Sequence, residues 1–269
     1  VSVRGNVSSQ YLTALLMLAP LIAPAEGLTI RIEGELISRP YVDMTVRMMR
    51  DFGAMVQELG GAFVVLPGTY RAKNAYRVEA DASGASYFLA LGALTGGPVT
   101  VTGVGEGSMQ GDVAFADALA LMGAQVEKTA EAITVSRDPS VRLKGIDLDC
   151  TRIPDAAMTF VPMALMTDSP VRLTGIASWR VKETDRLAAM ACEMRKFGAS
   201  VEEGPDYIVV SKPEDVGLRA ATVDTYDDHR MAMSLTLAAC AGVPVTVNDP
   251  GCTAKTYPSF FEEFARLTR

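Results

Sequence analysis

The sequence contains a single histidine, His229, and only four cysteines, which are widely separated and form no Cys-x-x-Cys pair. Zinc sites and disulfide-stapled folds need several such residues at close spacing, so the sequence indicates neither. A reducing, cytoplasmic setting is the simplest interpretation of this cysteine usage.

An excess of positive charge and a long apolar run are also missing. Lys and Arg number 25 against 32 Asp and Glu, which gives a net charge of −7. A nucleic-acid-binding protein should show a basic balance, so local basic clusters indicate a small anionic ligand instead. The longest apolar run, residues 11–23, is interrupted by Pro20. It is shorter than the roughly 20 residues of a membrane span and lacks the flanks of a signal peptide.

What the sequence does contain is a repeat. Its 269 residues, 49% of them hydrophobic, are enough for one large domain or two ordinary ones. A strand-like run that ends in a turn glycine or its substitute recurs four times, at intervals of 69, 72 and 74 residues. The four runs are residues 29–34, 99–103, 171–175 and 245–249. Such a period predicts one supersecondary unit used several times.

Each of the first three strands is followed by the pattern of an amphipathic helix. These helices have Asp43, Asp112 or Asp185 near the start and end at Gly-Ala, where the glycine suits a helix C-cap. A β-hairpin should follow, such as residues 62–66 paired with 76–79. A second kind of helix is apolar nearly all round and should be buried on every side. Its four examples are residues 11–18, 87–94, 156–166 and 231–241.

Residues 179–186 (Trp-Arg-Val-Lys-Glu-Thr-Asp-Arg) place charges in a turn where a helix begins. A helix start offers unpaired N–H groups and a positive dipole end, so Lys182 and Arg186 would complete a receptor for phosphate or carboxylate. The carboxylate of Glu183 would repel an anion bound there, and a role in proton transfer would explain its presence. The alternative interpretation of this stretch is a capped helix with a solvated, salt-bridged first turn.

Two further cations, Arg230 and Lys255, occupy equivalent turns of the repeat. Asp81 and Ser83 at another helix start fit ordinary N-caps, but a cation there opposes the helix dipole. We therefore expect Lys182, Arg186, Arg230 and Lys255 to share a compensating anion.

Seven runs, in order along the whole chain, resemble the motifs of the 5-enolpyruvylshikimate-3-phosphate synthase family. They are residues 7–10, 38–41, 108–112, 153–157, 179–186, 227–232 and 252–256. The resemblance implies an α/β fold of six βαβαββ units in two lobes, the inverse α/β barrel of enolpyruvyl transferases, with buried parallel helices that begin at the cleft. Four units can be counted here, the last one partial. Residues 1–79 would form an incomplete first lobe that binds shikimate phosphate, and residues 80–269 the second lobe.

The family moves the enolpyruvyl group of phosphoenolpyruvate onto the 5-hydroxyl of shikimate 3-phosphate, without a metal or an organic cofactor. Such a reaction must neutralise two phosphates and two carboxylates and must move protons. The resemblance implies Asp155 as the base for the attacking hydroxyl and Glu183 as the group that serves the methylene carbon. Arg186, Arg230 and Lys255 would clamp phosphoenolpyruvate, with Gln10 in contact with both substrates and His229 in a supporting role. The residues implied for shikimate 3-phosphate are Ser8, Ser9, Gln10, Ser38, Tyr41, Asp155, Ser178 and Lys182.

Several of these residues also have a purely structural interpretation. Asp155 could be a helix N-cap, His229 a satisfied structural histidine, and Tyr41 a packed aromatic after Pro40. Ser178 stands where the family commonly has an asparagine, so its contact with shikimate would be weaker or mediated by water.

The family's N-terminal loop lysine and several arginines have no counterpart before Ser8. We therefore expect the isolated chain to have negligible synthase activity and to associate with an N-terminal segment of roughly 160 residues. Two other hypotheses are the related transferase that acts on UDP-N-acetylglucosamine and a non-catalytic anion-binding repeat. Neither nucleic acid nor a membrane is an expected partner.

Overall fold

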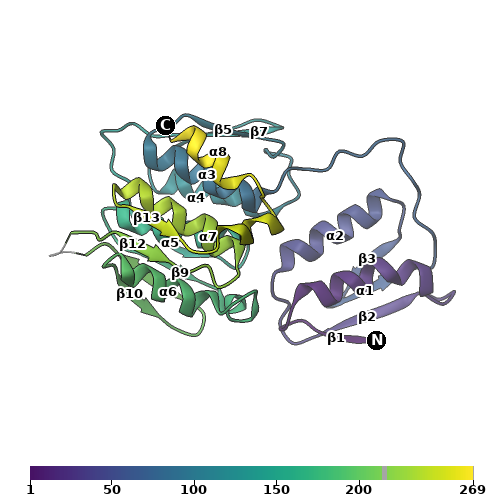
Figure 1. Cartoon of the computed structure of the whole chain (residues 1–269). Coiled ribbons are helices and arrows are strands. Elements are labelled where there is room, and N and C mark those ends of the chain that lie inside the picture. Colours follow the sequence, from purple (N-terminus) through teal and green to yellow (C-terminus); the bar gives the residue numbers. More distant parts are fainter. Residues whose placement is uncertain (214–216, 269) are drawn as a thin grey trace. The chain divides into compact units, whose positions relative to one another are not determined.

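The computed structural model describes residues 1–213 and 217–268, and the chain divides into two compact units (Figure 1). Unit 1 consists of Val1–Val78 and Met109–Gly111, and unit 2 of Glu79–Ser108 and Asp112–Arg269. It stays a prediction that residues 1–79 and 80–269 are the two lobes that bind the substrates.

Unit 1 is a single βαβαββ unit, which confirms the predicted repeat pattern. Its elements are β1 (Ser2–Arg4), α1 (Ser9–Ile22), β2 (Leu28–Glu33), α2 (Arg39–Asp51), β3 (Val56–Leu59) and β4 (Ala62–Val65). The sheet has the order β1-β2-β4-β3, with β1 parallel to β2 and the other pairs antiparallel. Leu16 of α1, Val42 of α2 and Ile30 of β2 meet in its core.

The hairpin of unit 1 differs from the one predicted. β3 pairs with β4 across Gly60-Gly61, whose φ angles of 56° and 80° suit a tight turn that only glycine adopts without strain. Residues 76–79 are in no strand, and the ring of Tyr76 lies 5.0 Å from that of Phe52. The prediction of a hairpin between residues 62–66 and 76–79 was wrong because the Gly-Gly turn closes a nearer pair.

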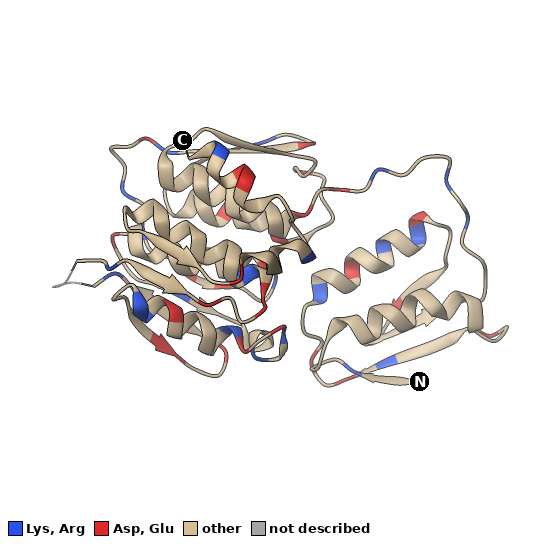
Figure 2. Cartoon of the chain, in the orientation of Figure 1, with Lys and Arg blue, Asp and Glu red and all other residues tan. Residues whose placement is uncertain are grey.

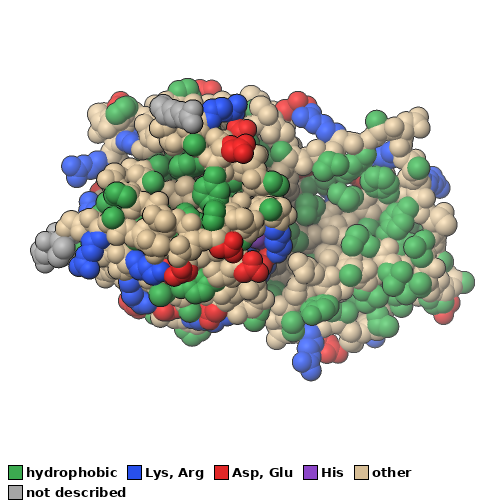
Figure 3. Space-filling model, viewed as in Figure 1, with side chains coloured by type: hydrophobic (Ala, Val, Ile, Leu, Met, Phe, Trp, Pro, Cys, Tyr) green, Lys and Arg blue, Asp and Glu red, His purple; other side chains and the backbone are tan. Residues whose placement is uncertain are grey.

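The helix α1 is not buried on every side, as its composition had suggested. Leu12 and Leu16 face the sheet, whereas Tyr11, Leu21 and Ile22 are 65%, 60% and 55% exposed. Hydrophobic side chains of unit 1 are visible on the molecular surface in Figure 3. Within unit 1, the described elements cover α1 on one side only.

Unit 2 contains three versions of the repeat. The first has α3 (Ala82–Thr95), β5 (Val99–Thr102), α4 (Ala114–Leu121), β6 (Gln125–Lys128) and β7 (Ala132–Ser136). The second has β8 (Asp147–Asp149), a buried helical segment, β9 (Val171–Thr174), α6 (Arg186–Lys196), β10 (Ser200–Glu203) and β11 (Ile208–Ser211). The third has β12 (Ala221–Val223), α7 (His229–Thr236), β13 (Val245–Val247) and α8 (Phe260–Leu267). The sheets have the orders β5-β7-β6, β10-β11-β9-β8 and β12-β13.

The inner helices of unit 2 are buried as predicted, except at the end of the predicted helix 231–241. There the 3₁₀ helix η5 (Leu237–Ala241) leaves Ala239 exposed and Cys240 and Ala241 half-buried. All residues of α7 and those of α3 up to Leu94 are buried. The predicted helix 156–166 consists of the 3₁₀ helix η2 (Ala156–Thr159), the α-helix α5 (Phe160–Met163) and the 3₁₀ helix η3 (Ala164–Met166). Pro162 lacks the N–H that a regular α-helix would use there, which explains the interruption. Among the described residues, no helix combines the length and apolar character needed to cross a membrane.

The amphipathic helix α8 closes the core of unit 2 through Phe260, which is fully buried. Five aromatic rings lie with their centroids 5.3–6.0 Å from the Phe260 ring. They belong to Tyr87, Phe88, Tyr257, Phe261 and Phe264.

We expect Phe260→Ala to lower the free energy of unfolding of unit 2 by about 3–5 kcal/mol, because it leaves a cavity among these rings. Denaturant titration monitored by circular dichroism measures the change. The control Leu121→Ala removes a side chain that is 70% exposed on α4 and should change the unfolding free energy by less than about 0.5 kcal/mol. Equal losses in the two variants would contradict the packing role of Phe260.

Candidate active site

The side chain of Arg186 is the centre of a charged network in unit 2. The helix α6 begins at Arg186 because Asp185 caps it, with the Ala188 N–H donating to the Asp185 carboxylate over 3.1 Å. The Arg186 side chain is only 1% exposed, and its guanidinium binds three carboxylates. The nitrogen–oxygen distances are 2.7 Å to Asp228, 2.8 Å to Glu183 and 3.1 Å to Asp155.

The other three cations predicted from the sequence reach the same carboxylates. Arg230 lies 3.2 Å and Lys182 3.7 Å from Asp155, and Lys255 forms an ion pair with Glu183. Basic and acidic residues are close together near α7 in Figure 2. We call this set the charge cluster, which consists of Asp155, Lys182, Glu183, Arg186, Asp228, Arg230 and Lys255. Four cations and three carboxylates therefore converge within one unit.

Two of these cations do not occupy the position in a helix that the sequence suggested. Arg186 and Arg230 lie in the first turns of α6 and α7, but Lys255 ends the 3₁₀ helix η6 (Pro250–Lys255), five residues before α8. Lys182 directly follows another 3₁₀ helix, η4 (Ala177–Val181). The prediction that all four begin helices was wrong for these two lysines. They reach the cluster because their turns lie beside it in the fold.

The position of Asp155 is set from two directions. The fully buried Trp179 donates its indole N–H to the Pro154 carbonyl over 2.6 Å. On the other side, the carboxylate of the buried Asp112 accepts from the Ala156 N–H over 3.4 Å. Asp155 itself precedes η2 but makes no side-chain cap hydrogen bond. Its carboxylate binds the cations of the cluster, so the N-cap interpretation does not describe it.

Charge and burial determine the protonation of Glu183 and of the neighbouring His229. Burial alone would raise the pKa of Glu183, but the ammonium group of Lys255 and the guanidinium of Arg186 outweigh it and lower the pKa to about 2. Burial and the charge of Arg230 lower the pKa of His229. Glu183 is therefore an anion and His229 a neutral imidazole near pH 7.

Burial also affects two polar groups beside the cluster. Burial raises the pKa of Asp112, although the Ser83 hydroxyl donates to its carboxylate over 2.6 Å and opposes the shift. His229 Nδ1 is buried without a hydrogen-bond partner among the described residues and lies 3.7 Å from an oxygen of Asp228. The hypothesis that His229 is a fully satisfied structural histidine therefore does not fit this nitrogen.

Asp228 and Asp112 were not predicted as site residues, although the structure places Asp228 beside Arg186 and Asp112 beside Asp155. Asp228 caps α7, with the Arg230 N–H donating to its carboxylate over 2.8 Å, and it is fully buried. The polar pair Asp227-Asp228 before a helix was the signal of a cap. The contact of Asp112 with residue 156 spans 44 positions, and no local signal predicts it.

Ser178 is half-buried on η4, next to Trp179, and its side chain makes no hydrogen bond within the described part of the chain. Its proposed contact with shikimate remains a prediction.

Five predicted substrate residues lie in unit 1, at the beginnings of its two helices. Ser8 caps α1 and accepts from the Gln10 N–H over 3.2 Å, and Ser9 is the first residue of that helix. Ser38 precedes α2 in a left-handed conformation with φ 54°, and Tyr41 lies in the first turn. The Ile37 N–H donates to the Gly5 carbonyl over 3.2 Å, so the loops before the two helices lie together.

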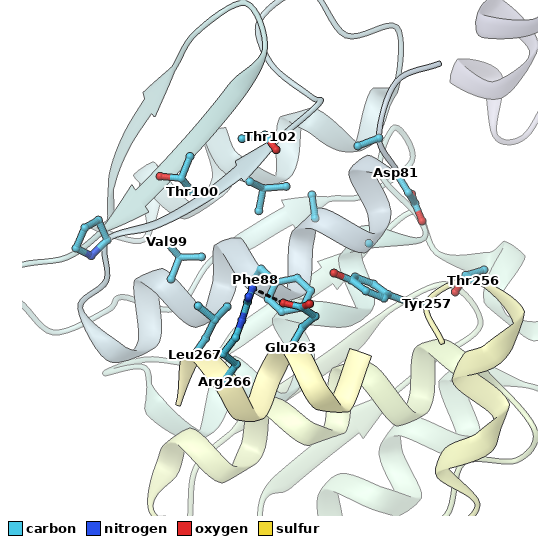
Figure 4. A pocket seen from close by; sticks show the side chains of 15 residues that line it. Asp81, Phe88, Val99, Thr100, Thr102, Thr256, Tyr257, Glu263, Arg266 and Leu267 are labelled. Carbon is cyan, nitrogen blue, oxygen red and sulfur yellow. Dashed lines mark hydrogen bonds and ion pairs between the residues drawn. The ribbon is translucent and has the colours of Figure 1, made fainter. Parts of the chain in front are cut away.

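A hollow of unit 2 with a volume of about 550 Å³ lies apart from the charge cluster, between β5 and α8 (Figure 4). Thr100, Tyr257 and the ion-paired Glu263 and Arg266 line it, and no residue of the charge cluster does. Within residues 1–213 and 217–268, no group of three or more His, Cys, Asp or Glu side chains is arranged to hold a metal ion.

Comparison with solved structures identifies the fold. The EPSP synthase from Acinetobacter baumannii superposes with a TM-score of 0.76 at 25% identity, over 99% of this chain and 62% of that chain. The enolpyruvyl transferase NikO from Streptomyces tendae superposes with a TM-score of 0.74 at 18% identity, which shows a shared fold alone. The α/β fold of enolpyruvyl transferases that the family resemblance implied is therefore confirmed.

Comparison with curated sequences extends along the whole chain. The 3-phosphoshikimate 1-carboxyvinyltransferase of Thiobacillus denitrificans is 56% identical over 272 residues, which are 99% of this chain and 62% of that protein. The enzyme of the same name from Paraburkholderia phytofirmans is 52% identical over 274 residues, 100% of this chain and 63% of that protein. The chain thus spans less than two thirds of the length of these relatives. The family model described as EPSP synthase (3-phosphoshikimate 1-carboxyvinyltransferase) matches residues 1–264, and the chain belongs to this family.

Proposed function

We propose that this chain forms part of an enzyme that transfers the enolpyruvyl group of phosphoenolpyruvate to the 5-hydroxyl of shikimate 3-phosphate. The observation that supports this function best is the charge cluster. An enolpyruvyl transfer between two anions needs several cations and at least two proton carriers in one place, and unit 2 supplies both.

Phosphoenolpyruvate would bind by exchange of ion-pair partners. The side chains of Arg230 and Lys255 are 11% and 56% exposed, and each pairs with one carboxylate of the cluster. A phosphate or carboxylate group can accept hydrogen bonds from these cations with little rearrangement, and the planar fork of Arg230 suits a bidentate contact. The buried guanidinium of Arg186 would add its positive charge to the attraction on the bound anion. The same guanidinium also keeps the carboxylates of Asp155 and Glu183 at fixed positions.

Asp155 and Glu183 would carry the protons. Asp155 would accept the proton of the attacking hydroxyl, since its carboxylate lies 3.1–3.7 Å from the nitrogens of three cations. Glu183 would take up a proton when the substrate binds and pass it to the methylene carbon as the hydroxyl oxygen bonds to the neighbouring carbon. It would later remove a proton from the resulting methyl group as phosphate leaves. Its low pKa comes from Lys255 and Arg186, so an anionic substrate that engages Lys255 would raise the pKa and make Glu183 a better proton donor.

Shikimate 3-phosphate would be held by Lys182 and by the helix starts of unit 1. Ser8, Ser9 and Ser38 offer hydroxyl and backbone N–H groups where α1 and α2 begin, a favourable place for phosphate. Gln10 and Tyr41 would contact the substrates from the same helices, and Ser178 from η4.

We further propose that turnover requires the part of the relatives' length that this chain does not span. More than a third of the relatives' length is not spanned by this chain, and the exposed face of α1 in unit 1 would suit contact with additional polypeptide.

All four cysteines are free thiols, which agrees with a reducing compartment such as the cytoplasm.

The test supplies this chain with the remaining part of the Thiobacillus denitrificans relative and measures phosphate release from both substrates. We expect negligible turnover from the chain alone and turnover from the mixture. Asp155→Asn and Glu183→Gln should each lower kcat about 10²–10⁴-fold, because each removes a proton carrier. The matched control Asp147→Asn alters a 69% exposed carboxylate that pairs with Arg172, and it should leave kcat unchanged. Full activity of both site variants would contradict the proposal and favour a non-catalytic anion-binding repeat.

A calorimetric titration separates the two transferase hypotheses. We expect the same mixture to bind shikimate 3-phosphate and to show no heat with UDP-N-acetylglucosamine. Lys182→Ala should weaken shikimate 3-phosphate binding about tenfold or more, because it removes a charge-assisted contact with phosphate. Preferential binding of the UDP-sugar would assign the chain to the related reaction instead.

The charge state of Glu183 can be measured directly. We expect the carboxyl carbon of Glu183 to remain in its ionised position in ¹³C NMR spectra down to about pH 4, since the ordinary pKa of glutamate is about 4.3 and the cluster lowers it. Lys255→Ala should raise the pKa, because it removes the hydrogen bond that lowers it most. A wild-type titration at the ordinary glutamate pKa would show that the cation pair does not act on Glu183.

A further inference from the structure

The loop between β12 and α7 is held in a strained conformation next to the charge cluster. Tyr226 and Asp227 both have φ 55°, in the left-handed region. For a residue with a bulky side chain this conformation costs roughly 1–2 kcal/mol, and it persists only where the surroundings hold it. The next residues along the chain are Asp228, which binds Arg186, and the cluster cation Arg230.

The group that holds the strained loop is Glu193 of α6. Its side chain is fully buried, and both of its oxygens are used. The Tyr226 hydroxyl donates to Oε1 over 2.7 Å, and the Asp224 N–H donates to Oε2 over 3.0 Å. Lys196 balances the buried charge from 2.7 Å and also donates to the Asp224 carboxylate over 2.8 Å.

The helix α6 therefore holds this loop at two points. Arg186, its first residue, binds Asp228 at the end of the loop, and Glu193 binds the middle of the loop. The two side chains are seven residues apart, which is two helical turns, on the same face and about 10 Å apart along the axis. A shift of Tyr226 away from Glu193 would let Asp228 and Arg230 move relative to Arg186.

We infer that Glu193 and Tyr226 form a positioning pair that fixes Asp228 and Arg230 in the geometry that binds phosphoenolpyruvate. This inference rests on the proposed function of the charge cluster. The pair touches no substrate and acts only through the loop. Burial and the Glu193 carboxylate raise the pKa of Tyr226, so its hydroxyl keeps the proton that the hydrogen bond needs.

The variant that tests the pair is Tyr226→Phe, which removes one hydroxyl from a side chain that is 41% exposed and should therefore still fold. The chain offers a matched control in Tyr207→Phe. Tyr207, directly before β11, donates to Glu202 of β10 over the same distance, 2.7 Å. Both variants delete a tyrosine–glutamate hydrogen bond, but only the first acts on the loop before α7.

Three measurements are made on each full-length chain: the melting temperature, the Kd for phosphoenolpyruvate by calorimetry, and deuterium exchange of the peptide that spans residues 224–231. For Tyr226→Phe we expect about tenfold weaker phosphoenolpyruvate binding and faster exchange in this peptide, with a melting temperature within a few degrees of wild type. Tyr207→Phe should change neither binding nor this peptide. Glu193→Gln should act in the same direction as Tyr226→Phe, and the double variant should show less than the sum of the two effects.

The outcomes separate this inference from the proposed function. Wild-type affinity in Tyr226→Phe, or an equal loss of affinity in Tyr207→Phe, would overturn the positioning role. If the wild-type chain binds no phosphoenolpyruvate, the proposed binding site is wrong. In that case, unchanged exchange of residues 224–231 in Tyr226→Phe would refute the pair as well. Faster exchange would leave a pair that orders the loop without the proposed ligand, which also overturns the inference as stated.

Discussion

The guanidinium of Arg186 is the interaction on which the rest of the site depends. A cation with 1% exposure cannot be left unpaired, because the desolvation of a buried charge costs several kcal/mol. Three carboxylates therefore surround it, from the start of η2 (Asp155), the turn before α6 (Glu183) and the cap of α7 (Asp228). One side chain thereby holds three separate segments of unit 2 together.

The same carboxylates face a second group of cations with a different degree of exposure. Asp155 and Glu183 bind Arg186 on their buried side and Lys182, Arg230 or Lys255 on the other. Lys182 and Lys255, with side chains 27% and 56% exposed, can change partners at low cost, whereas Arg186 at 1% cannot. Arg230 lies between these extremes, with a side chain that is 11% exposed. The cluster thus combines a fixed inner layer with an outer layer that is suited to binding and release of an anion.

The repeated unit explains why these groups meet, although its copies have diverged. Each inner helix of unit 2 follows a polar turn, and the starts of η2 and α7 supply Asp155, Asp228 and Arg230. The start of α3 supplies no cation. There, Asp81 caps the helix, and Ser83 donates to the buried Asp112, which in turn binds the backbone beside Asp155. One copy of the turn therefore supports the acid that another copy presents.

Sequence alone determined the repeat, the buried inner helices of unit 2 and the family, because apolar spacing, turn glycines and short motifs are local properties of the chain. It also named six of the seven cluster residues through their motifs. Tertiary structure decided which side chains meet. The pairs Arg186–Asp228 and Glu183–Lys255 span 42 and 72 positions. The exposed face of α1 and the hydrogen bond between Tyr226 and Glu193 likewise depend on which elements pack together. Such contacts form only after the helices are packed, so no periodicity or cap signal within a single segment records them.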